Sequence, residues 1–290
     1  MHIWMVISLN LYLESLTNMK YKDLFSLKNK VSVITGSTGI LGKVLSSALA
    51  ENGSNIALID LDKGKLSRLS KNIIKKYKVK CKAYVCDVSD EDQVKKTIIN
   101  IEKDIGKIDV LLNNAATKTD SLKEYFKPLE KYNLKTWQKI MNTNLDGMYI
   151  VAKEVGTRMA KRNKGSIIQT SSIYSSVMAP DQRIYKGSEY LGTTINTPAA
   201  YTASKAGVVG LTLHLASYWA KNKVRVNTLS PGGIYSGQNK KFINNYSNKV
   251  PLNRMGKKEE IVGTALFLAS DASSYVTGQN IFVDGGMSIC

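Results

Sequence analysis

The chain has 290 residues, 43% of them hydrophobic, which is enough to bury a sizeable core as one domain. Its cysteines (Cys81, Cys86 and Cys290) and two histidines lack the paired spacing of a zinc site or a disulfide framework, which indicates a reducing compartment. The formal net charge is +18, but only six of the 41 basic residues are arginine and no aromatic-interleaved basic groove is visible. This argues against nucleic-acid binding and suits the attraction of an anionic substrate.

The first 18 residues are apolar, yet they lack the basic segment and the small-residue cleavage site of a signal peptide. They are also too short to span a bilayer. We therefore expect residues 1–20 to be an extension outside the fold, with Met19 as the usual start. Residues 21–290 are expected to form a single cytoplasmic domain that makes no membrane contact.

A glycine-rich turn follows the first predicted strand, the apolar run at residues 31–34. An amphipathic stretch over residues 41–50 comes next, so the order is strand, turn, helix. Gly36 permits a tight turn, Gly39 lets a phosphate approach the backbone, and Gly42 allows close packing of the helix. Free amides at the start of the helix favour a pyrophosphate. The pattern predicts a dinucleotide site, with a merely structural turn as the alternative.

The next predicted strand, residues 55–60, ends in Asp60, about 20 residues after the glycines. A carboxylate at that place accepts hydrogen bonds from the adenosine ribose and repels a 2'-phosphate. We therefore expect NAD to be preferred. Lys63 and Lys65 lie near enough in the sequence to leave NADP possible.

Three further apolar segments end in polar residues that can face a ligand. They are residues 80–88 with Asp87, residues 108–116 with Asn113 and Asn114, and residues 165–172 with Ser171 and Ser172. Strands that alternate with helices predict an α/β fold, in which a parallel sheet is covered on both faces. Ligands of such sheets bind beyond the carboxyl ends of the strands. Helix caps and turns alone are a poor explanation for four consecutive polar strand ends.

Tyr201 and Lys205 lie four positions apart on an apolar-periodic stretch, about one helical turn from each other. An ammonium near a phenol stabilises the phenolate, which lowers the phenol's pKa from about 10 and makes it a usable general acid or base. The spacing alone is a weak signal. Its weight comes from the motifs around it.

Together these motifs resemble the short-chain dehydrogenase/reductase family, compact type, from about Leu27 to Gly286. The resemblance rests on TGSTGILG, NNAA, MNTNLDG with Asn144, TSS with Ser172, the Tyr201 and Lys205 pair, SPGGI at residues 230–234, and the closing segment that ends in FVDGG. It implies a Rossmann-type doubly wound parallel sheet of about seven strands in three α/β/α layers. It also implies hydride transfer between a nicotinamide and a secondary alcohol or ketone.

The resemblance assigns four catalytic roles. Tyr201 would be the general acid or base, Lys205 would lower its pKa and hold the nicotinamide ribose, Ser172 would orient the substrate oxygen, and Asn144 would support a proton relay. The implied cofactor contacts are Gly36, Thr38, Gly39, Ile40, Leu41, Asp60, Leu61, Asp87, Val88, Asn114, Ala115, Tyr201, Lys205, Pro231, Gly232, Ile234 and Ser236. Residues 200–221 and 259–269 resemble the faces on which family members form dimers and tetramers. We therefore expect a homo-oligomer, and we favour a homotetramer over a dimer.

The chain departs from the compact pattern in two ways. The turn glycines follow GxxGxxG, a spacing more usual in the extended branch of the family. Ser172 and Tyr201 are 29 positions apart, so some residues around 175–199 are inserted between them. Such an insertion begins and ends at the active-site mouth and is expected to select the substrate. A solvated loop or a subunit contact is the alternative.

The inserted segment is polar and rich in tyrosine, which suits a polyhydroxylated or anionic substrate. It has a weaker resemblance to oxidoreductases of flagellin-glycan and lipopolysaccharide sugar biosynthesis, a carbohydrate role. Arg183 is its only arginine, and the guanidinium fork suits a carboxylate or phosphate. We expect Arg183 to contact the substrate, unless it pairs with Asp181 or Glu189 and only braces the loop.

The sequence leaves a second class of function open, a catalytically silent dinucleotide-binding regulator or nucleic-acid-binding protein. Fold alone would not separate the two classes. The intact set of Asn144, Ser172, Tyr201 and Lys205 favours the enzyme, because a pure binder has no need for all four.

Overall fold

A computed structural model describes residues 21–175 and 177–289, so the expected N-terminal extension lies outside the described residues. Its centre is a seven-stranded sheet in the order β3-β2-β1-β4-β5-β8-β9, and every pair in it is parallel. The strands are β1 (Val31–Thr35), β2 (Asn55–Asp60), β3 (Cys81–Val85), β4 (Val110–Asn113), β5 (Gly165–Thr170), β8 (Val224–Pro231) and β9 (Asn280–Val283). The predicted Rossmann-type architecture is confirmed.

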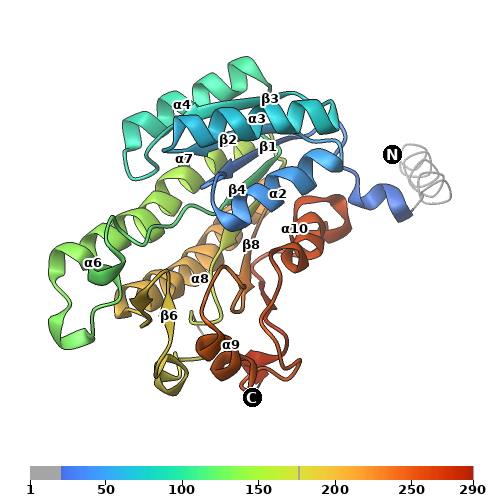
Figure 1. Ribbon diagram of the computed structural model, residues 1–290. Coiled ribbons are helices and arrows are strands. Elements are labelled where there is room, and N and C mark those ends of the chain that lie inside the picture. The colour runs from blue at the N-terminus through green and yellow to red at the C-terminus, as the bar shows by residue number, and fades with distance from the viewer. Residues whose placement is uncertain (1–20, 176, 290) are drawn as a thin grey trace, which may run out of the picture.

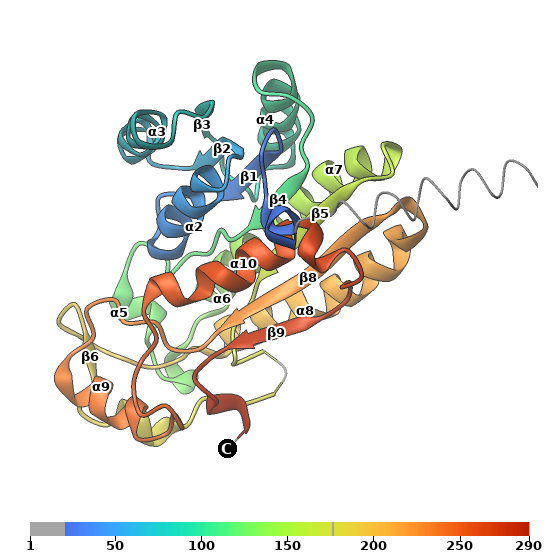
Figure 2. The same ribbon diagram turned by 90° about the vertical axis from the view of Figure 1, so that its right-hand side faces the viewer.

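Helices cover both faces of the sheet (Figures 1 and 2). One face carries α2 (Ile40–Glu51), α3 (Lys63–Tyr77) and α10 (Val262–Ala269), and the other carries α4 (Glu91–Asp104), α7 (Gly147–Lys161) and α8 (Ala199–Trp219). Side-chain caps start two of these helices: Asp62 accepts from the Lys65 amide and Asp90 from the Gln93 amide. None of the described helices is long and apolar enough to cross a membrane.

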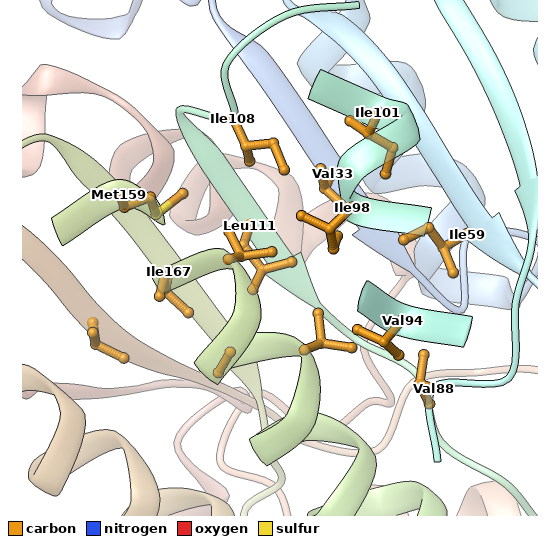
Figure 3. Close-up of a cluster of buried hydrophobic side chains, with 14 of the residues drawn as sticks. Val33, Ile59, Val88, Val94, Ile98, Ile101, Ile108, Leu111, Met159 and Ile167 are labelled. Atoms are coloured by element: carbon orange, nitrogen blue, oxygen red, sulfur yellow. The ribbon is translucent and has the colours of Figure 1, made fainter. Parts of the chain in front are cut away.

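The core consists of two apolar layers, one on each side of the sheet. Alternation along a strand sends neighbouring side chains to opposite faces, so Val33 joins one layer and Ile34 the other. Figure 3 shows the first layer, where Ile98 and Ile101 of α4 pack against Val33 and Leu111 of the sheet. These strands are buried on both faces, which explains why they read as continuous apolar runs.

The inserted residues form a small lobe at the carboxyl end of the sheet. It contains a 3-10 turn (Gln182–Tyr185) and the antiparallel pair β6 (Glu189–Tyr190) and β7 (Thr193–Thr194). The lobe lies beside α9 (Lys240–Ser247) in both views (Figures 1 and 2). The Tyr185 ring stacks on Phe242 of α9 at 6.2 Å between centroids. The insertion is therefore anchored by apolar contacts, unlike a solvated loop.

Candidate active site

The glycine-rich turn is shaped as the sequence predicts. Gly36 has φ of +61°, a left-handed conformation that favours glycine, and a Cβ on Gly42 would lie 2.1 Å from the Gly36 carbonyl oxygen. The close contact that Gly42 allows is therefore between helix α2 and the glycine-rich turn, rather than between the helix and the strand. Gly39 is the N-cap of α2 and provides no side-chain cap. The first amides of the helix remain available for a pyrophosphate.

Asp60, at the end of β2, braces this turn. Its Oδ2 accepts from the backbone amide and the hydroxyl of Thr38, both at 2.8 Å, and its Oδ1 accepts from the Leu61 amide at 2.7 Å. A carboxylate has roughly four lone-pair sites, so one acceptor position remains for a ribose hydroxyl. Asp60 therefore holds the turn as well as facing the place expected for the adenosine ribose.

The NNAA segment ties the middle strands together. The Thr35 hydroxyl donates to Asn113 Oδ1 at 3.1 Å and accepts from the amides of Asn114 and Ala115 at 2.9 and 3.0 Å. The Asn113 side chain also donates to the Met148 carbonyl of α7 at 2.8 Å. All these polar groups are satisfied inside the core, so the carboxyl ends of β1 and β4 are fixed where a ligand would lie.

Tyr201 and Lys205 lie in the first turns of α8, with Lys205 Nζ 6.0 Å from the centroid of the Tyr201 ring. Lys205 is 3% exposed and donates to the Thr170 carbonyl at 2.9 Å. Burial lowers the pKa of Lys205 to about 8. An ammonium has three donors, so two of them remain for a ligand.

The phenol does not have the lowered pKa that the sequence analysis expects. Burial raises the pKa of Tyr201 above its ordinary value, and a hydrogen bond with Ser172 acts in the opposite direction. The reason is that desolvation penalises the phenolate, and this effect outweighs the opposing effect of the Ser172 hydrogen bond. In the unliganded geometry Tyr201 is a protonated phenol, and so a proton donor.

Ser172 contacts Tyr201 directly, whereas Asn144 contacts Ser204 one turn further along α8. Ser172 follows β5, is buried, and bonds the phenol as stated above. Asn144 lies in a single π-helical turn (Asn142–Asp146) between α6 (Leu134–Met141) and α7. Its Oδ1 accepts from the Thr117 amide at 2.9 Å, and its Nδ2 donates to Ser204 Oγ at 3.4 Å. Both ends of the Asn144 amide are thus engaged in holding the β4 loop against α8.

A cavity of about 860 Å³ joins these parts. Every residue predicted to contact the cofactor lines it, and so does Ser172, whereas Asn144 and Arg183 do not. The half beyond Tyr201 is lined mainly by aromatic and polar side chains that the sequence analysis did not single out: Lys118, Tyr125, Phe126, Tyr174, Tyr185, Tyr190, Asn196, Gln238, Phe242 and Tyr246. Several of these residues belong to the insertion. Its tyrosines, each with an apolar ring and a polar hydroxyl, were the feature of the sequence that could have indicated them.

Arg183 does not occupy the place expected for a substrate ligand. Its guanidinium makes a two-pronged ion pair with Asp181, with contacts of 2.7 to 3.2 Å, and its side chain is 80% exposed. Lys249 reaches the same carboxylate at 3.1 Å. This geometry corresponds to the alternative in which Arg183 pairs with Asp181 and only braces the loop. The Asp181 carboxylate already occupies the guanidinium donors that a substrate would need.

No cluster of three or more histidine, cysteine, aspartate or glutamate side chains suited to a metal occurs within residues 21–175 and 177–289. A buried phenol, a serine hydroxyl and a lysine ammonium line the same cavity as the glycine-rich turn.

Comparisons with known proteins agree with this geometry. Residues 36–288 match a family profile described as Enoyl-(Acyl carrier protein) reductase. A sorbose reductase of Candida albicans is 36% identical over 271 residues, covering 91% of this chain and 89% of that one. A 3-oxoacyl-[acyl-carrier-protein] reductase of Thermotoga maritima is 35% identical over 267 residues, covering 91% and 99%.

Among solved structures, a gluconate 5-dehydrogenase from Burkholderia cenocepacia in complex with NADP and tartrate superposes with a TM-score of 0.80. It is 31% identical, and the match covers 92% of this chain and 98% of that one. The similarity thus extends through the cofactor turn, the strand ends and the closing strand.

Proposed function

This chain belongs to the short-chain dehydrogenase/reductase family and is an oxidoreductase acting on alcohol or ketone groups, and we propose that its substrate is a sugar-derived, anionic ketone or alcohol. The observation that carries this proposal is the polar and aromatic half-cavity beyond Tyr201, to which the insertion contributes Tyr185, Tyr190 and Asn196. A fatty acyl chain would find Ile173, Ile195 and Met255 there, but most of this wall is aromatic or polar. A polyhydroxylated molecule would find phenols, amides and a lysine.

The residues present fit a nicotinamide dinucleotide. The uncapped start of α2 beside Gly36 suits the pyrophosphate, and Asp60 offers an acceptor to the adenosine ribose. Tyr201 and Lys205 lie at the opposite end of the same cavity, where the nicotinamide ribose would bind. When bound, the cofactor supplies or accepts the hydride at its nicotinamide ring.

The chain's own groups handle the proton and the substrate oxygen. In reduction, the Tyr201 hydroxyl gives its proton to the substrate oxygen as hydride reaches the carbonyl carbon, and Ser172 hydrogen-bonds that same oxygen. The adjacent Lys205 ammonium stabilises the phenolate that remains. Lys205 would hold the nicotinamide ribose, and with its pKa lowered to about 8 it would also be a source from which Tyr201 regains its proton. Asn144 holds the surrounding backbone and supports this relay. Oxidation reverses both transfers.

We propose NAD as the preferred cofactor on the strength of Asp60, whose carboxylate would repel a 2'-phosphate. The comparisons do not support this preference, because the gluconate 5-dehydrogenase structure holds NADP. Lys65 lines the same end of the cavity but is paired with Asp62 at 2.9 Å. The test is the ratio of kcat/KM for NADH and NADPH with one carbonyl substrate. A larger value for NADPH would contradict the proposal.

The substrate class is tested by following NAD(P)H oxidation with matched carbonyl compounds. We expect turnover with ketoses or keto acids of sugars, and little with a 3-oxoacyl thioester of long chain. The relative named for sorbose and the one named for gluconate support this choice. The relative named for an acyl-carrier-protein substrate defines the competing result: turnover of the thioester alone would overturn the proposal.

We further propose a cytoplasmic homo-oligomer, a tetramer or dimer, with a role in carbohydrate biosynthesis. Helix α8 supports association, because it exposes Leu213 and Tyr218 to solvent, with exposures of 55% and 65%. Apolar residues of this size on one helix favour a protein contact. Light scattering at micromolar concentration would give the mass, and a monomer would contradict the oligomer.

A further inference from the structure

Lys118 is a cation in the cavity wall that has no anionic partner in the described part of the chain. It follows β4 in the loop after the NNAA segment and lines the cavity. Its Nζ lies 4.3 Å from the centroid of the Tyr190 ring. Within residues 21–175 and 177–289, no aspartate or glutamate forms an ion pair with it.

The other lysines of the cavity wall are already engaged. Lys65 pairs with Asp62, and Lys139 pairs with Asp120. Lys205 donates to a backbone carbonyl beside Tyr201. Lys118 is solvent-exposed because the cleft is open, yet the surrounding protein lowers its pKa by burial. An ammonium that faces an open cleft and has no carboxylate partner among the described residues is available to bind an anion.

Two contacts fix Lys118 on the substrate side of the cavity. The amide of the preceding residue, Thr117, donates to Asn144, which anchors the backbone of this loop beside the catalytic groups. Tyr190 belongs to the inserted hairpin, forms a β-bridge with Gln238, and packs against the same apolar cluster as Tyr201. The ammonium is therefore held between the β4 loop and the insertion, away from the cofactor turn.

We propose that Lys118 binds the anionic group of the substrate, a carboxylate or phosphate distant from the reacting carbonyl, and that the ring of Tyr190 positions it. This inference rests on the proposed function. It assigns to Lys118 the binding of the substrate's anionic group that the sequence predicts for Arg183. A cation over an aromatic face keeps its N–H donors pointing outward, so the ammonium can form charge-assisted hydrogen bonds with an anion while it stays on the ring.

The test uses pairs of compounds that differ only in the charged group. L-sorbose and 5-keto-D-gluconate share one carbon skeleton and one ketone, and differ in a terminal hydroxymethyl or carboxylate. D-fructose and D-fructose 6-phosphate are the corresponding pair for phosphate. Lys118→Met removes the charge, and Lys123→Met, outside the cavity wall, is the control for the same change in net charge. Tyr190→Phe keeps the aromatic face and Tyr190→Leu removes it.

For the anionic member of the preferred pair, Lys118→Met should raise KM about tenfold or more, since a lost charge-assisted bond is worth that factor. For the neutral member, KM should stay within about twofold, and kcat should change little for both. Tyr190→Leu should raise KM for the anion severalfold, whereas Tyr190→Phe and Lys123→Met should behave as wild type. Equal changes for neutral and anionic members, or weaker NAD(P)H binding in Lys118→Met, would overturn the inference.

Calorimetric titration of D-gluconate and D-glucitol into the NAD(P)+-loaded protein separates this inference from the proposed function. Binding of gluconate that is tighter than binding of glucitol, and is lost in Lys118→Met, supports the anion site even if no keto-sugar is turned over. In that case only the proposed function would fail. Binding that does not depend on Lys118, or no binding of gluconate at all, overturns the anion site whatever the turnover.

Discussion

The buried ammonium of Lys205 should cost the free protein stability. Its side chain is enclosed among the residues between β5 and α8, and burial lowers its pKa from 10.5 to about 8. The unfolded chain therefore holds this proton more tightly than the folded protein does. The penalty is fully present below pH 8 and disappears as the pH rises from about 8 toward 10.5.

A difference of two to three pKa units corresponds to about 3 kcal/mol at neutral pH. Lys205→Met removes the charge but also the hydrogen bond to Thr170, worth about 1 kcal/mol. We therefore expect the variant to be more stable than wild type at pH 7 by about 2 kcal/mol, or roughly 5 °C in melting temperature for a chain of this size. The advantage should shrink toward zero or reverse near pH 10. Turnover should be lost at both pH values.

Urea unfolding of the cofactor-free protein at pH 7 and pH 10 measures this difference. The control is Lys161→Met, which removes an exposed lysine of α7 and should give the same small change at both pH values. If Lys205→Met were less stable than wild type by the same amount at pH 7 and at pH 10, folding would not lower the pKa of Lys205. The argument for a strained, buried proton carrier would then be wrong.

Three further changes test the site. Tyr201→Phe should cut kcat by at least about a thousandfold while leaving the NADH dissociation constant within twofold, and more than a tenth of the activity remaining would refute its role in proton transfer. Asp60→Ala combined with Leu61→Arg should shift the ratio of kcat/KM toward NADPH by more than tenfold; an unchanged ratio would show that Asp60 only braces the turn. Arg183→Ala breaks an exposed pair with Asp181, so it should change stability little and affect charged and neutral substrates alike. A selective loss for the anionic substrate would restore Arg183 as a ligand.

The sheet could be predicted because its strands are buried on both faces. Each one reads as a short apolar run followed by a polar residue, and the helices between them show a regular apolar period. The strand ends were less certain: the segment predicted at residues 80–88 forms a strand only over Cys81–Val85. Beyond the strand, the Cys86 amide still donates to the Asp60 carbonyl of β2, and Asp87 accepts from the Ser89 amide in the turn that leads to α4.

The spacing of Tyr201 and Lys205 did not identify the site by itself. Tyr149 and Lys153 have the same spacing on α7, and Lys153 lies 5.6 Å from the Tyr149 ring. That pair is on the outer surface, where Lys153 is bound to Glu91. Only the neighbouring motifs at the strand ends distinguish the two pairs, because they place a serine and a glycine-rich turn at the same edge of the sheet as Tyr201.

The substrate ligand could not be predicted from residue type alone. The planar donors of Arg183 favour an anionic substrate, but Asp181 lies two positions away and forms an ion pair with Arg183. This contact needs no tertiary structure. Lys118 carried no signal in a chain so rich in lysine. What distinguishes it is that no carboxylate of the described residues pairs with it, and that its ammonium lies over the ring of Tyr190, which is 72 positions away and reaches it only through the fold.

The insertion also connects substrate selection with the segment after β8. Its Glu189 carbonyl accepts from the Asn239 amide at 3.1 Å, and Tyr190 bridges to Gln238, so β6 is tied to the residues that follow SPGGI. Gln238 in turn accepts from the Ser236 amide at 2.7 Å, and Ser236 lines the cavity. A movement of the segment after SPGGI on cofactor binding would therefore move Tyr190 and the ammonium that rests on it. On this geometry, cofactor binding and recognition of the substrate's charge should be thermodynamically coupled. The reason is that hydrogen-bonded segments connect the parts of the cavity wall that contact the two ligands.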